Sequence, residues 1–164
     1  MERRGGRGRQ SLPDEPAPPA SRTELKQKAV RLLARREHTR AELLRKLAAH
    51  GTEEDVAAVL DSLQNVGLQS DARFAESYLR SYGERFGAAK LRQTLRSKGV
   101  PSEVAEAHLG EADLPDETER ACGVWAKKFS AAPADAREWA RQARFLQSRG
   151  FSTDVIRRVL KDVE

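Results

Sequence analysis

A glycine-anchored pattern that occurs three times constrains the fold of this 164-residue chain more than any other feature. Its anchors, Gly51, Gly99 and Gly150, lie 48 and 51 residues apart. Each glycine follows a leucine by four residues and precedes an acidic residue by four, and a valine comes directly after each acidic residue. Self-similarity at such a spacing is typical of chains built from stacked structural units. The sequence therefore predicts three repeats.

Each repeat carries the signals of three short helices. Apolar residues recur at helical spacing, as they do over residues 25–33. Thr39 and Glu42 have the spacing of a capping box, which starts a second helix. Gly51 is expected to end that helix by taking the left-handed conformation that glycine adopts without strain. The acidic residue after each anchoring glycine then falls in the first turn of a third helix, where the helix dipole favours negative charge.

These signals predict an all-α fold of three tandem three-helix repeats, each resembling a helix-turn-helix unit. Hydrophobic residues make up 38% of the chain and charged residues 34%, which suits several thin cores better than one thick core. We place the repeats at residues 23–67, 68–112 and 113–164. Residues 1–22, rich in Arg, Gly and Pro, are expected to form a disordered arm. That arm either touches phosphates or is a dispensable tail.

The residue types that carry catalysis or bind metals are scattered. His38, His50 and His108 lie far apart in the chain, with no cysteine or carboxylate at ligand spacing, so we expect each to be a solvated or half-buried helix residue. Cys122 lies on the same predicted helix face as Trp125 and Phe129 and is interpreted as a small core residue. The sequence contains no phosphate-binding loop, nucleophile elbow or dinucleotide fingerprint. We therefore expect no catalytic site, no metal and no cofactor.

The cellular location is inferred from three absences in the sequence. There is no apolar run long enough to span a bilayer and no signal peptide after Met1. A single cysteine also excludes an internal disulfide framework. The expectation is a cytoplasmic protein without a membrane contact.

Charge is distributed unevenly within each repeat. The chain has a net charge of +5, of which residues 23–164 contribute only +3, yet the middle helix of every repeat is basic. Each such helix alone is explained by a solvated, salt-bridged surface, whereas recurrence in three units favours a functional ridge, and both interpretations stay open. The candidate partner-binding residues are Arg40, Arg45, Lys46, Arg85, Lys90, Arg92, Arg96, Lys98, Arg137, Arg141, Arg144 and Arg149.

Four segments, in the same order along the chain, resemble the RecX family of RecA regulators. The first is Arg36-Glu37-His38-Thr39-Arg40-Ala41-Glu42-Leu43, continuing to Lys46-Leu47, and the second is Asp71-Ala72-Arg73-Phe74-Ala75-Glu76-Ser77-Tyr78. The third runs from Phe86-Gly87 to Lys98-Gly99-Val100, and the fourth is Arg149-Gly150-Phe151-Ser152. Ala88 stands where a proline is common in the family, which concerns the turn and not the function. Together the segments cover almost all of residues 24–164.

The resemblance implies an elongated, curved array that lies in the groove of the RecA filament on single-stranded DNA. Members restrain RecA by hindering filament extension, ATP turnover, strand exchange and co-protease activity, and so act on recombinational DNA repair and the SOS response. The implied partner is the RecA filament, with the enclosed single-stranded DNA as a second candidate, and the chain is expected to be a monomer. The alternative is an autonomous helix-turn-helix-like DNA-binding protein, against which the small net charge of residues 23–164 counts.

Overall fold

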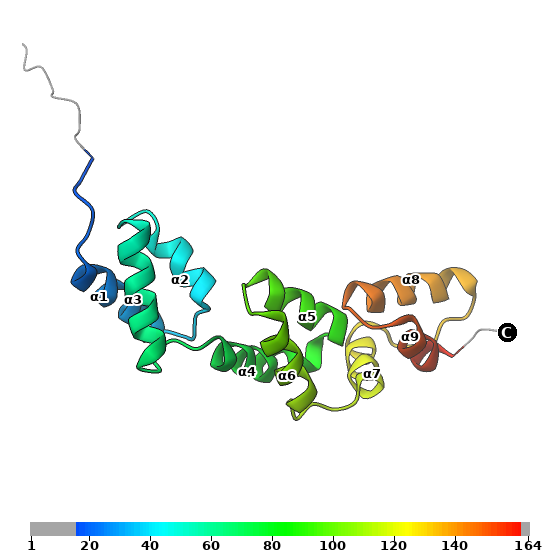
Figure 1. Ribbon diagram of the computed structural model, residues 1–164. Helices are drawn as coiled ribbons and strands as arrows, with labels where there is room; N and C mark the ends of the chain where they lie inside the picture. Colours follow the sequence, from blue (N-terminus) through cyan, green and yellow to red (C-terminus); the bar gives the residue numbers. More distant parts are fainter. Residues whose placement is uncertain (1–15, 162–164) are drawn as a thin grey trace, which may run out of the picture.

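The chain forms a row of three-helix units, as seen in a computed structural model that describes residues 16–161 (Figure 1). The first unit contains α1 (Arg22–Leu33), α2 (Arg40–Leu47) and α3 (Glu53–Asn65). The second contains α4 (Asp71–Tyr82), the short 3-10 helix η1 (Gly83–Arg85), α5 (Ala88–Ser97) and α6 (Ser102–Glu111). The third contains α7 (Glu117–Lys128), α8 (Ala136–Ser148) and α9 (Thr153–Leu160). The predicted all-α array of three three-helix repeats is confirmed. Most of the predicted arm, residues 1–15, lies outside the described residues.

The three repeats are packed alike, each around its own core. In every repeat the first and second helices pack on the third, so that α1 and α2 contact α3, and the later repeats follow the same rule. The leucine four residues before each anchoring glycine is completely buried: Leu47, Leu95 and Leu146 each have 0% exposure. The buried side chains form three separate clusters, one per repeat. An array of this kind has cores that are thin and a surface that is long.

Side-chain caps fix the starts of the helices where the sequence predicts them. The Thr39 hydroxyl accepts a hydrogen bond from the Glu42 amide at 3.0 Å, and the Glu42 carboxylate accepts one from the Thr39 amide at 3.3 Å. The predicted capping box at α2 is thus confirmed. Ser152 caps α9 in a similar way, accepting from the Val155 amide at 3.3 Å.

Two of the three anchoring glycines end their helices in the left-handed conformation expected of Gly51. Gly99 and Gly150 have φ angles of 91° and 87°, in the left-handed region. The prediction is wrong for Gly51, because the chain leaves α2 through a right-handed Ala48 and the glycine itself has no positive φ. Position 51 has no room for a larger residue, because a Cβ there would lie 2.6 Å from Leu25 Cδ1.

Two residues differ in burial from the expectation. Cys122 is exposed, because the neighbouring Ala121 takes the inward position on α7 and one residue turns a helix by about 100°. His38 is buried, with 3% exposure, instead of solvated or half-buried. The second repeat covers the loop that holds it, and the Gln69 side-chain amide donates to the His38 carbonyl oxygen at 3.3 Å.

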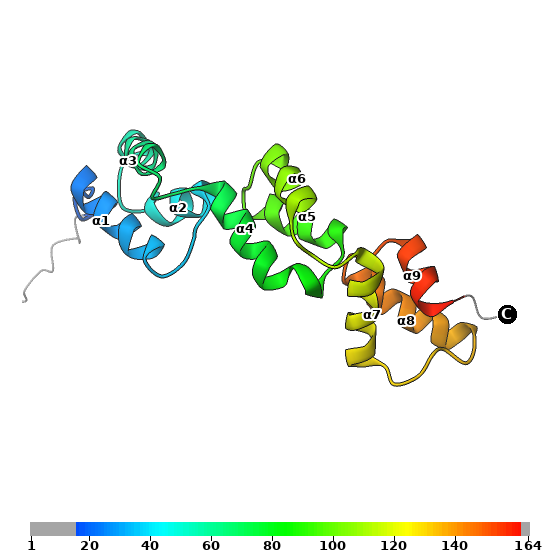
Figure 2. The same cartoon turned by 90° about the horizontal axis from the view of Figure 1, so that it is seen from below.

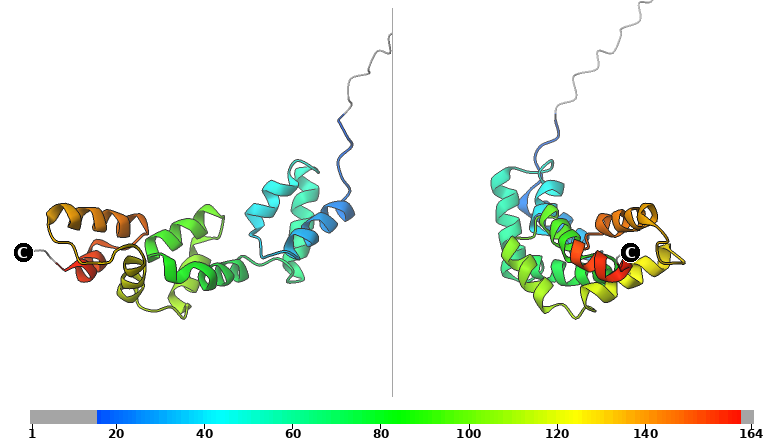
Figure 3. Two further views of the ribbon diagram at one scale, coloured as in Figure 1. Left: turned by 180° about the vertical axis from the view of Figure 1, so that it is seen from behind. Right: turned by 90° about the vertical axis from the view of Figure 1, so that its right-hand side faces the viewer.

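The middle helices α2, α5 and α8 lie along the same side of the array (Figure 1; Figure 3, left). We call the boundary between the first and second repeats the first joint, and that between the second and third repeats the second joint. At the first joint, the hydroxyl of Thr39, the N-cap of α2, donates to the carbonyl oxygen of Lys98, the C-cap of α5, at 2.6 Å. At the second joint, the amide of Gly87, the N-cap of α5, donates to the carbonyl oxygen of Arg149, the C-cap of α8, at 2.8 Å. Each joint therefore brings the negative end of one helix dipole to the positive end of the next.

A second hydrogen bond also recurs at both joints. The amide of Arg40, the first residue of α2, donates to the carboxylate of Asp71, the first residue of α4, at 2.9 Å. The amide of Ala88, the first residue of α5, donates to the carboxylate of Glu117, the first residue of α7, at 3.1 Å. Each bond satisfies a first-turn amide that its own helix leaves unpaired. The units that these two recurrent bonds connect follow one another in a row, and the view from below shows this order (Figure 2).

Candidate interaction surface

Three of the twelve candidate partner-binding residues are neutralised by carboxylates of the chain itself. Two of these carboxylates lie on the third helix of the same repeat, and the remaining one lies across the first joint. An exposed pair of this kind contributes little to stability, but it reduces the charge that a partner meets. The pairs are Arg40 with Asp61 at 2.7 Å, Arg92 with Glu106, and Lys98 with Glu42 at 3.7 Å.

The other nine predicted cations have no carboxylate within ion-pair distance among residues 16–161. Six of them are exposed along the row of middle helices, with members on α2, α5 and α8: Arg45, Lys46, Arg96, Arg137, Arg141 and Arg144. The structure thus brings unpaired cations from all three repeats onto helices that are joined end to end. We call these three helices with their cations the basic row. A series of unpaired charges along one side is the arrangement that attracts an anionic partner.

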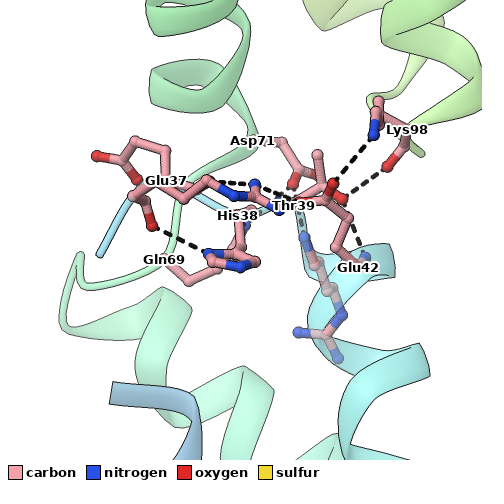
Figure 4. Close-up of polar contacts among 9 residues, drawn as sticks. Glu37, His38, Thr39, Glu42, Gln69, Asp71 and Lys98 are labelled. Atoms are coloured by element: carbon pink, nitrogen blue, oxygen red, sulfur yellow. Dashed lines mark hydrogen bonds and ion pairs between the residues drawn. The ribbon is translucent and has the colours of Figure 1, made fainter. Parts of the chain in front are cut away.

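The first joint is a polar network in which charges balance (Figure 4). Glu42 has 5% exposure and lies between Arg36, at 3.1 Å, and Lys98, at 3.7 Å. Burial raises the pKa of the Glu42 carboxyl, but the hydrogen bonds from Arg36 and Thr39 and the charge of Lys98 outweigh it and bring the pKa below its ordinary value. Glu42 is therefore ionised at neutral pH and cancels charge at this joint.

Burial in the same joint lowers the pKa of His38, even though the hydrogen bond to the Arg36 carbonyl oxygen, at 3.0 Å, opposes the shift. In the unfolded chain a histidine takes up a proton near pH 6.5. In the folded protein His38 takes it up only at lower pH. The unfolded state therefore binds more protons, and stability falls as the pH drops below about 6.5.

We expect His38→Phe to reduce the dependence of the melting temperature on pH. Phe86 occupies the equivalent place directly before the N-cap of α5, so the aromatic ring suits the site. Between pH 7 and pH 5.5 the natural chain should lose stability, and a loss of 1 kcal/mol lowers Tm by about 2–4 °C for a chain of this size. Calorimetry at both pH values measures this difference. An unchanged pH dependence in the variant would contradict the assignment.

The second joint lacks the carboxylate that balances the charge of the first joint. Three residues after the N-cap of the middle helix, the first joint has Glu42 and the second has Lys90. The C-cap that meets it is Lys98 in the first joint and Arg149 in the second. The second joint thus places cations where the first places a carboxylate beside a cation.

A groove of about 860 Å³ lies at the second joint, between η1, α7 and the end of α8. We call it the joint groove. Of the cations that line it, the sequence predicted Arg85 and Arg149 and missed the others, because they lie on the first helices α4 and α7 and not on a middle helix. The Lys127–Lys128 doublet was the available signal, but only the fold shows what lies opposite it. The lining cations are Arg80, Arg85, Arg120, Lys127, Lys128 and Arg149, and the lining carboxylates are Glu84 and Glu119.

Two further properties of residues 16–161 bear on function. None of their helices is both long and apolar enough to cross a membrane. Within the same residues, no three His, Cys, Asp or Glu side chains form a group that could hold a metal ion.

Family models of RecX match each of the three repeats. The model of the first three-helix domain matches residues 26–63, that of the second matches residues 70–109, and that of the third matches residues 115–160. Together they cover more than half of the chain and follow one another in the order of the repeats.

Curated relatives and solved structures agree with the family models. A regulatory protein RecX from Leptothrix cholodnii is 51% identical over 138 residues, which cover 84% of this chain and 87% of that protein. A regulatory protein RecX from Chromobacterium violaceum is 49% identical over 138 residues, covering 83% and 88%. The crystal structure of RecX from Lactobacillus salivarius aligns with a TM-score of 0.71 at 22% identity, covering 85% of this chain and 94% of that one. At that identity, the structural likeness supports the fold alone.

Proposed function

The chain belongs to the RecX family of regulatory proteins, and from this premise we propose that it is a negative regulator of the recombinase RecA. It binds in the groove of the RecA filament on single-stranded DNA and hinders filament extension, ATP hydrolysis, strand exchange and co-protease activity. Through these effects it modulates recombinational DNA repair and the SOS response. It acts in the cytoplasm as a monomer, by binding and without catalysis or a cofactor.

The observation that supports this proposal best is the basic row, which links all three repeats end to end. A RecA filament presents the same protomer surface again and again, so a row with cations in every repeat can make several similar contacts at once. Once one repeat is bound, the next contacts form at a high effective concentration, and weak contacts add up to a stable complex. The end-to-end hydrogen bonds at Lys98 and Arg149 keep the repeats in line for this purpose.

We expect the triple substitution Arg45→Gln, Arg96→Gln and Arg144→Gln to weaken inhibition of RecA. It removes one exposed, unpaired cation from each middle helix and leaves the cores intact. The concentration that halves the DNA-dependent ATPase rate of RecA should rise about tenfold, since exposed charge contacts each contribute a fraction of a kcal/mol. A titration of RecA ATPase with each protein measures the effect.

The matched control is Arg31→Gln, Arg35→Gln and Arg158→Gln, which removes the same net charge from exposed positions outside the middle helices. This control should inhibit like the natural chain. If the two triple variants inhibit equally well, the basic row is not the contact surface. If the natural chain leaves RecA ATPase unchanged at a stoichiometric concentration, the proposed function is wrong.

A further inference from the structure

We propose that the joint groove binds the phosphodiester backbone of a single-stranded nucleic acid. The site differs from the basic row: it lies at the boundary of the second and third repeats, and most of its cations come from α4, η1 and α7. The inference rests on the charges, rings and backbone contacts of this groove. It does not depend on the proposed action on RecA.

The joint groove concentrates positive charge. Six cations against two carboxylates give its lining a net charge of +4, whereas all of residues 23–164 carry only +3. Arg80 pairs with Glu76 at 3.2 Å. For the other five cations, no carboxylate among the described residues lies within ion-pair distance. A hollow lined by one sign of charge focuses the field and attracts an anionic ligand.

Aromatic rings, in place of carboxylates, support these cations. The Arg149 guanidinium lies 5.2 Å from the centroid of the Phe145 ring and 5.8 Å from that of Phe86. The Lys128 ammonium lies 5.5 Å from the same Phe145 centroid. Contacts with ring faces hold cationic side chains in place. Because the rings carry no net charge, the cations remain available to a phosphate.

The second joint, beside the groove, is held by contacts too close for a larger residue. A Cβ on Gly87 would lie 2.2 Å from the Gly150 carbonyl oxygen, and a Cβ on Gly150 would lie 2.3 Å from Lys90 Cβ. Within the groove, the Arg120 guanidinium donates to the Pro115 carbonyl oxygen at 2.8 Å, while its Nε is buried with no acceptor. The two repeats that border the groove are thus held together before any ligand arrives, which lowers the entropic cost of binding.

The side chains favour a single-stranded nucleic acid among anionic ligands. Four of the six cations are arginines, whose planar fork matches phosphate oxygens. Arg85, which lines the groove, lies 5.5 Å from the centroid of the Tyr82 ring. This ring belongs to a neighbouring hollow, is 42% exposed and lies 5.0 Å from the ring of Tyr78. An exposed ring beside phosphate-binding cations offers a stacking surface for an unpaired base. In a duplex the base faces are already stacked.

An acidic peptide fits the joint groove less well. An extended peptide gains affinity mainly by adding a strand to a sheet edge, and residues 16–161 contain no strand. A helical peptide needs an apolar groove for its anchoring side chains, whereas most residues that line this groove are charged. An acidic peptide would therefore be held by side-chain charges alone.

The test is fluorescence anisotropy of a labelled oligothymidylate titrated with the full chain, without RecA, at several salt concentrations. We expect the groove variant Arg85→Gln, Lys127→Gln, Lys128→Gln to bind at least about tenfold more weakly than the natural chain. The slope of log affinity against log salt should become shallower by about two, because each phosphate contact on a single strand contributes about 0.7. Oligouridylate should behave in the same way, since the groove contacts phosphates.

Two comparisons make this test decisive. The charge-matched variant Arg31→Gln, Arg35→Gln, Arg158→Gln should keep both the affinity and the salt slope, and equal loss in both variants would overturn the assignment to the groove. A polyglutamate peptide should displace the oligonucleotide poorly; displacement at an equal concentration of charges would overturn the nucleic-acid proposal in favour of an acidic peptide. Because RecA is absent, either failure leaves the proposed regulation of RecA standing, and unchanged RecA ATPase would leave this inference standing.

Discussion

Gly87→Ala is expected to destabilise the chain by about 2–4 kcal/mol, by forcing apart the second and third repeats. Gly87 has a φ of −74°, which alanine adopts easily, so the effect comes from space alone. An added Cβ would lie 2.2 Å from the carbonyl oxygen of Gly150, and backbone cannot rotate away as a side chain can. The shift also stretches the hydrogen bond from the Gly87 amide to Arg149. Urea denaturation followed by circular dichroism measures the change.

Gly123→Ala is the matched control for this prediction. Gly123 lies within α7, and a Cβ there meets nothing within 4 Å. Because glycine inside a helix costs about 0.5–1 kcal/mol relative to alanine, this variant should be slightly more stable than the natural chain. Equal stability of the Gly87 and Gly123 variants would contradict the close contact between Gly87 and Gly150 at the second joint.

Leu95→Ala is expected to unfold the middle repeat preferentially, at a cost of about 2–5 kcal/mol. Leu95 is completely buried in a core that its repeat does not share with the others. The same repeat supplies Lys98 to the first joint and Gly87 to the second, so both joints lose a partner when it opens. Hydrogen exchange should therefore accelerate most strongly from α4 to α6.

Leu47→Ala provides the comparison, since Leu47 is equally buried but belongs to a repeat with one joint. Its faster exchange should be confined to α1–α3, and the second joint should stay protected. Uniform acceleration along the chain in both variants would mean that the three cores unfold as one cooperative unit.

The repeats and helix starts could be predicted because their signals are local. The glycine, the leucine before it and the acidic residue after it lie within one or two helical turns, and a capping box such as Thr39 with Glu42 spans four residues. The burial of His38 and the role of Gly51 could not be predicted in this way. Both depend on a side chain or segment from another helix, Gln69 for the histidine and Leu25 for the glycine.

The interaction surface was predictable only as a set of cations. Which of them remain unpaired depends on residues distant in sequence, as with Lys98, which meets Glu42 across the first joint. The joint groove depends on the same kind of distant contact, since Arg80 and Lys128 face one hollow only after the second and third repeats pack together. The end-to-end bonds at the joints involve backbone carbonyl oxygens, which every residue carries and no sequence pattern marks.

The central claim, that this chain binds along the RecA filament, is tested most directly by co-sedimentation with RecA assembled on single-stranded DNA. The natural chain should pellet with these filaments at physiological salt. Much less should pellet with the same DNA alone or with RecA in the absence of DNA. A chain that stays in the supernatant with the filaments, or pellets as fully with the naked strand, would contradict the account.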